Sequence, residues 1–212
     1  FCSRGGFLLD MATKYPTDYN YLGLEIRPII AYQAQSRIPK YGLDGVLDFV
    51  GCNANVDLER ILQRVSTVQK QNGKVSSATE METRNGDDDN DSTCNLQMVT
   101  IQFPDPHFKA RHAKRRVVTP SLVKTLAKFM PEDSTVFLQS DVQIVLDDMR
   151  SSFRQHGDKY FEDTIESFEE YVEDNIFDVP TERETSVIER DLPVYRALFK
   201  RTDKVYQYDG SP

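Results

Sequence analysis

Residues 96–103 have the sequence LQMVTIQF, and this apolar stretch decides the fold because it predicts a buried strand. Pro104-Asp105-Pro106 follows at once and predicts that the strand ends there, since proline cannot donate a hydrogen bond to a sheet. Shorter apolar runs predict four more strands, at residues 21–26, 46–50, 135–138 and 194–200. The segments between them predict helices, at residues 7–12, 28–38, 58–65, 119–130 and 142–156.

Strands that alternate with helices predict an α/β fold with a mostly parallel sheet and helices on both of its faces. In such sheets, ligands bind at the carboxyl ends of the strands. The predicted strand ends carry Glu25, Asn53, Asp105 and Asp141. We therefore expect these four side chains to lie around one site.

The charges are unevenly distributed along the 212 residues, which carry a formal net charge of -8. Residues 80–91 carry -5 and residues 158–178 carry -8, so the rest of the chain carries +5. A net negative charge argues against binding to nucleic acid, but a local basic patch can still attract a polyanion. The bases are concentrated in one run of Lys109, Arg111, Lys114, Arg115 and Arg116, with His112 among them.

The remaining composition excludes several classes of protein. Residues 66–95 are polar and acidic with few large apolar side chains, which predicts a disordered insertion. Three scattered cysteines without a CxxC pair argue against a disulfide framework or structural zinc, so no metal is expected. No apolar run is long enough to span a membrane, which predicts a soluble protein.

Several strand-end residues allow two interpretations when they are taken one by one. Glu25 either binds ribose hydroxyls or caps a helix in solvent, and Asn53-Ala54 either faces a purine or caps the next helix. Gly5, in the turn Arg4-Gly5-Gly6, either allows a cofactor to approach the backbone or belongs to an ordinary turn. Cys52 is expected to be a small buried residue.

The sequence of residues 103–118, FPDPHFKARHAKRRVV, carries the most specific signal. Two prolines fix the backbone around Asp105, and five permanent cations with two histidines follow closely. A basic run alone could be a targeting signal or a nonspecific patch. Beside a rigid carboxylate at a ligand-binding edge, it suits a reaction on a polyanion, with cations holding phosphates.

This segment resembles the FPDPxxKxRHxKRR signature of the tRNA (guanine-N7)-methyltransferases, which use S-adenosylmethionine. Further matching motifs follow in the same order: RGGFLLDMA, YLGLEIR, CNA, Ser140-Asp141, and PTERE followed by LPVYR. The forms FPDPHF, FLQSDV and DVPTERE look most like the plant and algal plastid branch. The resemblance implies a Rossmann-like class I methyltransferase with a C-terminal antiparallel strand, methyl transfer to N7 of guanine in tRNA, and a chloroplast location. An accessory subunit is possible, although the plastid- and bacterial-type relatives do not require one.

The resemblance assigns roles residue by residue. Gly5, Glu25, Asn53, Ala54 and Asp105 match cofactor-binding positions, and Asp105 also matches the acid at the methyl-transfer site. The substrate-binding positions are matched by Lys109, Asp141, Thr181 and Glu184. The stretch that faces tRNA is matched by Arg111, His112, Lys114, Arg115 and Arg116.

The chain departs from the family pattern in three places. The strand expected before the glycine turn is missing, glycines are replaced at Phe1 and Ser3, and Asp191 stands where the family has glycine. We expect one methyltransferase domain, with its cofactor side in residues 1–65, an insertion in 66–95, and its catalytic and tRNA-binding side in 96–212.

Three other functions remain open at this point. The degraded glycine turn would suit a catalytically impaired homologue that still binds tRNA. A methyltransferase with another substrate would lack the signature around Asp105 and the pair Thr181 and Glu184. A protein-interaction module would use the acidic stretches instead.

Overall fold

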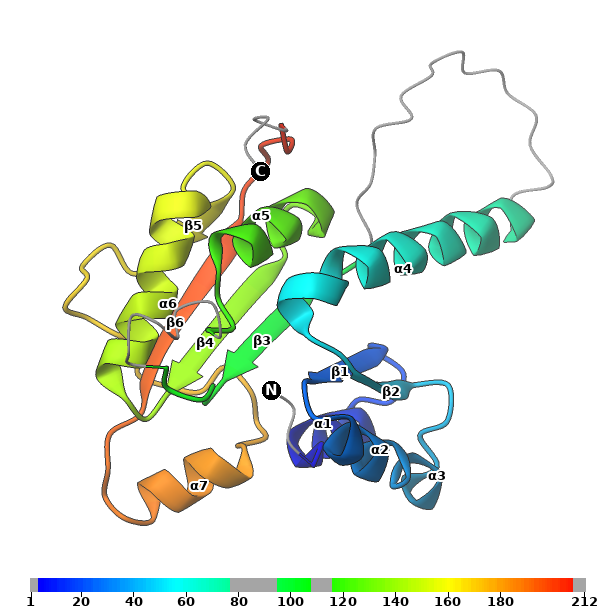
Figure 1. Ribbon diagram of the computed structural model, residues 1–212, viewed down its shortest axis with the longest axis horizontal. Coiled ribbons are helices and arrows are strands. Elements are labelled where there is room, and N and C mark those ends of the chain that lie inside the picture. The colour runs from blue at the N-terminus through cyan, green and yellow to red at the C-terminus, as the bar shows by residue number, and fades with distance from the viewer. Residues whose placement is uncertain (1–3, 77–94, 108–115, 208–212) are drawn as a thin grey trace.

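A computed structural model describes residues 4–76, 95–107 and 116–207 of the chain, and Figure 1 shows its helices and strands. Most of the predicted site lies within these ranges. Lys109, Arg111, His112, Lys114 and Arg115 lie outside them.

The N-terminal unit, residues 4–51, is a two-stranded parallel sheet with helices packed against it. It contains α1 (Gly6–Lys14), β1 (Tyr21–Glu25), α2 (Pro28–Gln35), α3 (Ile38–Tyr41) and β2 (Leu47–Gly51). A small apolar core holds it together, formed by Leu9, Ala12, Ala34, Ile38, Leu43, Leu47 and Phe49.

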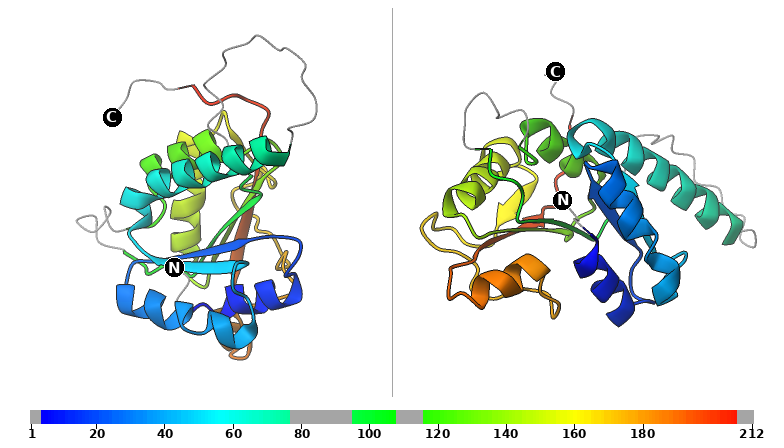
Figure 2. Two further views of the ribbon diagram at one scale, coloured as in Figure 1. Left: turned by 90° about the vertical axis from the view of Figure 1, so that its right-hand side faces the viewer. Right: turned by 60° about the horizontal axis from the view of Figure 1, so that its bottom comes forward.

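The C-terminal unit, residues 95–207, is built on a four-stranded sheet in the order β3-β4-β6-β5. Its elements are β3 (Met98–Gln102), α5 (Pro120–Phe129), β4 (Thr135–Ser140), α6 (Gln143–His156), β5 (Phe161–Asp163), α7 (Glu182–Ile188) and β6 (Tyr195–Arg201). β3 and β4 are parallel, whereas β6 runs antiparallel to β4 and β5. Helix α7 lies on the other side of this sheet from α5 and α6 (Figure 2, right).

The α/β fold and the antiparallel final strand are confirmed, and each predicted strand agrees with an observed one to within two residues. Helix α4 (Ala54–Ser76), which joins the two units, corrects the predicted start of the insertion at Ser66. The Ser66 and Thr67 hydroxyls donate to the carbonyls of Leu62 and Gln63, so these polar residues satisfy their donors within the helix. The rest of the predicted insertion, residues 77–94, lies outside the described ranges.

Two turns show why particular residues occupy them. Gly5 precedes α1 with φ 77°, and a Cβ atom there would lie 2.4 Å from the Phe49 ring, so both conformation and space favour glycine. Asp191 has φ 55°, so an aspartate adopts the left-handed conformation that glycine prefers. The chain therefore makes a left-handed turn here with an aspartate.

The described strands form two separate sheets, and the edges of β1 and β3 lie on the wall of one cavity between them. The segment before α7 contacts both units, because the Phe177 ring packs edge-on against Phe7 of α1 and Phe137 of β4. Asp178 accepts hydrogen bonds from Lys14 and Tyr15 of the N-terminal unit.

Candidate active site

The cavity between the units has a volume of about 2200 Å³ and reaches the carboxyl ends of β1, β3 and β4 and the segment that follows β2. Five of the predicted site residues lie on its wall, namely Asn53, Ala54, Asp105, Asp141 and Thr181. Residues more than a hundred positions apart in the sequence therefore meet at one site, at the strand ends where the alternating pattern placed it.

Asp105 is exposed on this wall, and the two residues before it hold its segment in place. Phe103 precedes it with φ 47°, an uncommon value for a bulky residue, and the Phe103 N–H donates to the Gln139 carbonyl at 2.8 Å. Pro104 is buried. Such backbone strain persists only where the surroundings enforce it, and it is concentrated at functional sites. Nothing in the sequence indicated the conformation of Phe103.

Glu25 is placed differently from the expectation, because its side chain is fully buried and does not lie on the cavity wall. One carboxylate oxygen accepts hydrogen bonds from the Arg27 backbone N–H at 3.1 Å and from Arg27 Nε at 2.9 Å. The Glu25 carbonyl accepts from the Cys52 N–H. The buried acid therefore orders the turn after β1, and its ribose contact stays a prediction.

Asn53 lies at the start of α4, where its side-chain oxygen accepts a hydrogen bond from the Asn55 N–H at 3.1 Å. This is the helix-capping geometry that was one of its two interpretations. Because Asn53 also lies on the cavity wall, capping holds it in place there. Burial raises the pKa of the neighbouring Cys52 thiol, which disfavours the reactive thiolate.

Asp141 follows β4, and its side chain is 18% exposed. It forms an ion pair with Arg183 of α7, and both residues lie on the cavity wall. Arg183 was not among the residues predicted to form the site. Only the tertiary structure brings α7 to the end of β4, so no local pattern predicts this pair.

Thr181 and Glu184 form a capping box at the start of α7. The Thr181 hydroxyl accepts from the Glu184 N–H at 3.0 Å, while Glu184 Oε2 accepts from the Thr181 N–H at 3.3 Å and from Asn175 Nδ2 at 2.7 Å. Glu184 Oε1 accepts from Arg196 at 2.8 Å, and Glu184 is 1% exposed. Thr181 thus reaches the cavity wall, whereas Glu184 points into the protein.

Among the predicted tRNA-facing residues, the structure describes only Arg116. Its guanidinium lies 2.5 Å from the Asp148 carboxylate of α6 and 3.4 Å from the His107 carbonyl oxygen. These contacts connect the end of the basic run to the Asp105 segment and to α6. Arg116 therefore links the Asp105 segment to α6.

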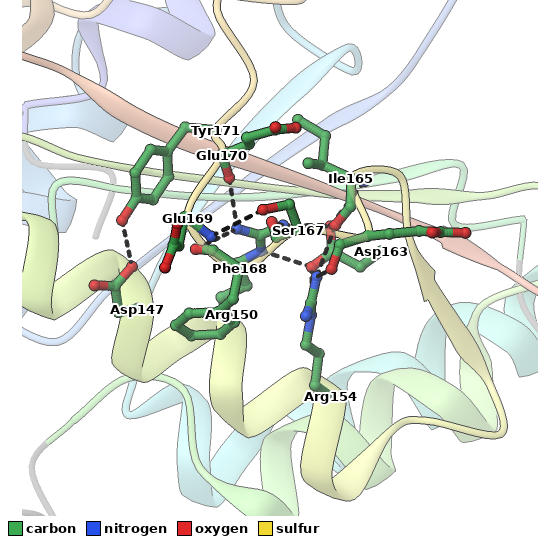
Figure 3. A network of polar contacts seen from close by, with 11 residues as sticks. Asp147, Arg150, Arg154, Asp163, Ile165, Ser167, Phe168, Glu169, Glu170 and Tyr171 are labelled. Carbon is green, nitrogen blue, oxygen red and sulfur yellow. Dashed lines mark hydrogen bonds and ion pairs between the residues drawn. The ribbon is translucent and has the colours of Figure 1, made fainter.

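A second network anchors the acidic stretch that precedes α7, and Figure 3 shows it. The buried guanidinium of Arg150 contacts Asp163 at 2.6 Å and donates to the carbonyls of Ile165, Ser167, Phe168 and Glu170. Arg154 also contacts Asp163, at 2.7 Å. The backbone of this acidic segment is therefore bound tightly to α6.

Comparison with known proteins identifies the family. A tRNA (guanine-N7)-methyltransferase from Microcystis aeruginosa is 40% identical over 199 residues, which cover 94% of this chain and 79% of the relative. The enzyme of that name from Synechococcus elongatus is 41% identical over 200 residues, covering 94% and 78%. The chain belongs to the tRNA (guanine-N7)-methyltransferase family.

A family model and a solved structure also resemble the chain. A family model described as "Putative methyltransferase" matches residues 92–197. Among solved structures, the antibiotic-resistance methyltransferase Kmr is 12% identical with a TM-score of 0.48, over 95% of this chain and 84% of that chain.

Two further findings apply to residues 4–76, 95–107 and 116–207, which the structure describes. No helix in them is long and apolar enough to cross a membrane. Within the same ranges, no three His, Cys, Asp or Glu side chains gather in a way that could hold a metal ion.

Proposed function

We propose that the chain transfers a methyl group from S-adenosylmethionine to N7 of a guanine in tRNA. The observation that carries this proposal is the 40% identity, over 94% of the chain, to relatives named for that activity. The cavity adds a structural reason, because it collects Asn53, Asp105, Asp141 and Thr181 at the strand ends.

S-adenosylmethionine fits the residues on the N-terminal side of the cavity. Gly6, Asn53 and Ala54 lie on the wall, and the left-handed Gly5 sets the turn that presents Gly6. Glu25 would meet the ribose only after its carboxylate turns from Arg27 toward the wall. When bound, the cofactor supplies an electrophilic methyl group on sulfonium.

The chemistry requires little of the protein beyond alignment and electrostatics. Guanine N7 already carries a lone pair, so holding it in line with the sulfonium methyl is the main contribution. Methyl transfer leaves a positive charge on the purine. Asp105, whose side chain is exposed on the cavity wall, would stabilise that developing charge.

On the opposite side, Asp141 and Thr181 would contact the guanosine, with Lys109 contacting the neighbouring phosphates. Arg111, His112, Lys114, Arg115 and Arg116 would hold the tRNA backbone. Glu184 would act on the substrate through Thr181, since its two oxygens are engaged inside the protein.

We expect the chain to act in a plastid, and we expect it to act without an accessory subunit. The motifs shared with the plastid branch and the similarity to the enzyme of Microcystis aeruginosa support this. Methylation by the purified chain alone tests the second point. A fluorescent fusion of the complete gene product, imaged in plant cells, tests the first.

The decisive experiment is methylation of bulk tRNA with radiolabelled S-adenosylmethionine, followed by mapping of the product. A transcript made with 7-deazaguanine is the matched control, because it lacks the N7 nucleophile. Label in the normal tRNA and none in the deaza transcript would support the proposal. Equal labelling of both would contradict it, and absence of cofactor binding would indicate an impaired homologue.

The variant Asp105→Ala tests the catalytic role within the same assay. Loss of one preorganised electrostatic group lowers turnover by about a hundredfold, while tRNA affinity should fall little. The control Asp158→Ala removes an exposed acid outside the cavity wall. Equal loss of turnover and affinity, or no loss of either, would exclude this role for Asp105.

A further inference from the structure

The outer surface of α2 and α3 exposes large side chains that the core does not use. Ile29 is 73% exposed and Tyr32 is 75% exposed, and their i, i+3 spacing places them on the same side of α2. Ala31 and Ala34 on the other side are buried. The exposed pair therefore serves no purpose in packing the N-terminal unit.

The α2–α3 segment is also basic in sequence. Residues 26–43 contain Arg27, Arg37 and Lys40 and no acid, in a chain whose net charge is -8. Lys40 is exposed. The Arg37 guanidinium lies 5.8 Å from the Tyr41 ring centroid and donates to the Arg4 carbonyl at 2.8 Å, so Arg37 is held in a defined position.

This surface begins at the edge of the proposed active site. Ile26 and Arg27, directly before α2, lie on the cavity wall. A smaller hollow of about 560 Å³, lined by Arg4, Gln33, Arg37 and Glu182, separates α2 from α7. Figure 1 shows that α2 and α3 lie at the end of the molecule opposite α6, the helix that carries Asp148.

We propose that the α2–α3 surface, formed by Ile29, Tyr32, Arg37, Lys40 and Tyr41, is a second RNA-contact surface for nucleotides flanking the target guanosine. The proposal rests on the proposed function. A base whose neighbour is drawn into an active site loses a stacking partner, and an exposed aromatic ring can replace it. Tyr32 supplies this ring, while Lys40 and Arg37 neutralise phosphates.

Charge favours RNA over a second copy of the chain as the occupant. A symmetric dimer through this surface would bring identical basic patches together, and like charges at an interface are unfavourable. RNA supplies both the negative charge and the flat apolar bases that the exposed side chains fit.

The test compares the wild-type chain with Tyr32→Ala/Lys40→Glu. Both side chains are exposed, so the fold should tolerate the changes. Lys159→Glu is the control for charge, because Lys159 is exposed and lies in the C-terminal unit. The measurements are affinity for an unmodified tRNA transcript at several salt concentrations, affinity for S-adenosylmethionine, and sedimentation of each protein.

We expect tRNA affinity to fall about tenfold in the double variant, with a shallower salt dependence and unchanged cofactor affinity. Lys159→Glu should change tRNA affinity less than the double variant does. Equal tRNA affinity in wild type and double variant, with methylation intact, would overturn the proposed RNA-contact surface and leave the proposed function standing. A wild-type dimer that the double variant dissociates would also overturn it, and a wild type that neither binds nor methylates tRNA would overturn the proposed function as well.

Discussion

The two units of the molecule reach stability by different means. In the C-terminal unit, β4 is buried along nearly its whole length between β3 and β6, and guanidinium groups inside the unit bind the surrounding loops. The N-terminal unit has two strands and a core of seven buried residues. The difference indicates that the C-terminal unit is a firm platform, whereas the N-terminal unit depends on its turns and on contacts across the cavity.

The largest effect on stability is expected at Arg150. The variant Arg150→Met should lower the free energy of unfolding by about 3–5 kcal/mol, because it leaves Asp163 and several backbone carbonyls without their buried partner. Urea unfolding measures this. The control Arg154→Met, at a side chain 30% exposed, should cost less, and equal losses would show that burial of Arg150 is not decisive.

A smaller effect is expected at Glu184, and it separates a positioning role from direct substrate contact. Glu184→Gln weakens the bond to the buried Arg196 and should cost about 2 kcal/mol of unfolding free energy. The value of kcat/KM for tRNA should fall with it, because Thr181 loses its fixed position. The control is Glu189→Gln, because Glu189 is exposed at the end of the same helix and lies outside the cavity wall. Lost activity at full stability would instead indicate that Glu184 touches the guanosine.

Gly5→Ala tests the N-terminal unit. The left-handed backbone and the close approach of Phe49 together should cost about 1–2 kcal/mol and reduce affinity for S-adenosylmethionine. Gly42→Ala is a matched control, because its φ is 67° but no atom lies within 4 Å of the added Cβ. It isolates the conformational cost. If both variants behaved alike, Phe49 would not be the cause.

The smallest expected effect concerns Asp178, which links the two units at the surface. Hydrogen bonds from Tyr15 and then Lys14 lower the pKa of Asp178 below its ordinary value. Since the pKa is lower in the folded state, the carboxylate contributes stability near neutral pH and loses it as pH falls through that lowered pKa. Hydrogen exchange of β1 and β2 across an acid titration measures this, with Asp178→Asn expected to flatten the dependence. A steeper dependence in that variant would contradict the link.

The sequence predicted regular elements well wherever local chemistry decides. Thr119 and Pro120 predicted the start of α5, and the Thr119 hydroxyl accepts from the Leu122 N–H. β5 and α7 were not predicted. β5 is only three residues long and depends on pairing with β6. Its Asp163 is buried, but Asp163 could not be told apart in the sequence from the exposed acids around it. The helix α4 was predicted too short, because its later residues are polar although they continue to form helix.

What the sequence determined by itself was the alternation of strands and helices, the rigid FPDP segment, and the set of polar strand-end residues. These follow from local periodicity and from the fixed backbone of proline. Only the tertiary structure decided that Glu184 faces inward, that Arg183 pairs with Asp141, and that Arg150 binds the acidic stretch. Each of these contacts joins segments whose separation in the sequence leaves no periodic signal, so packing of the sheet and its helices had to bring them together.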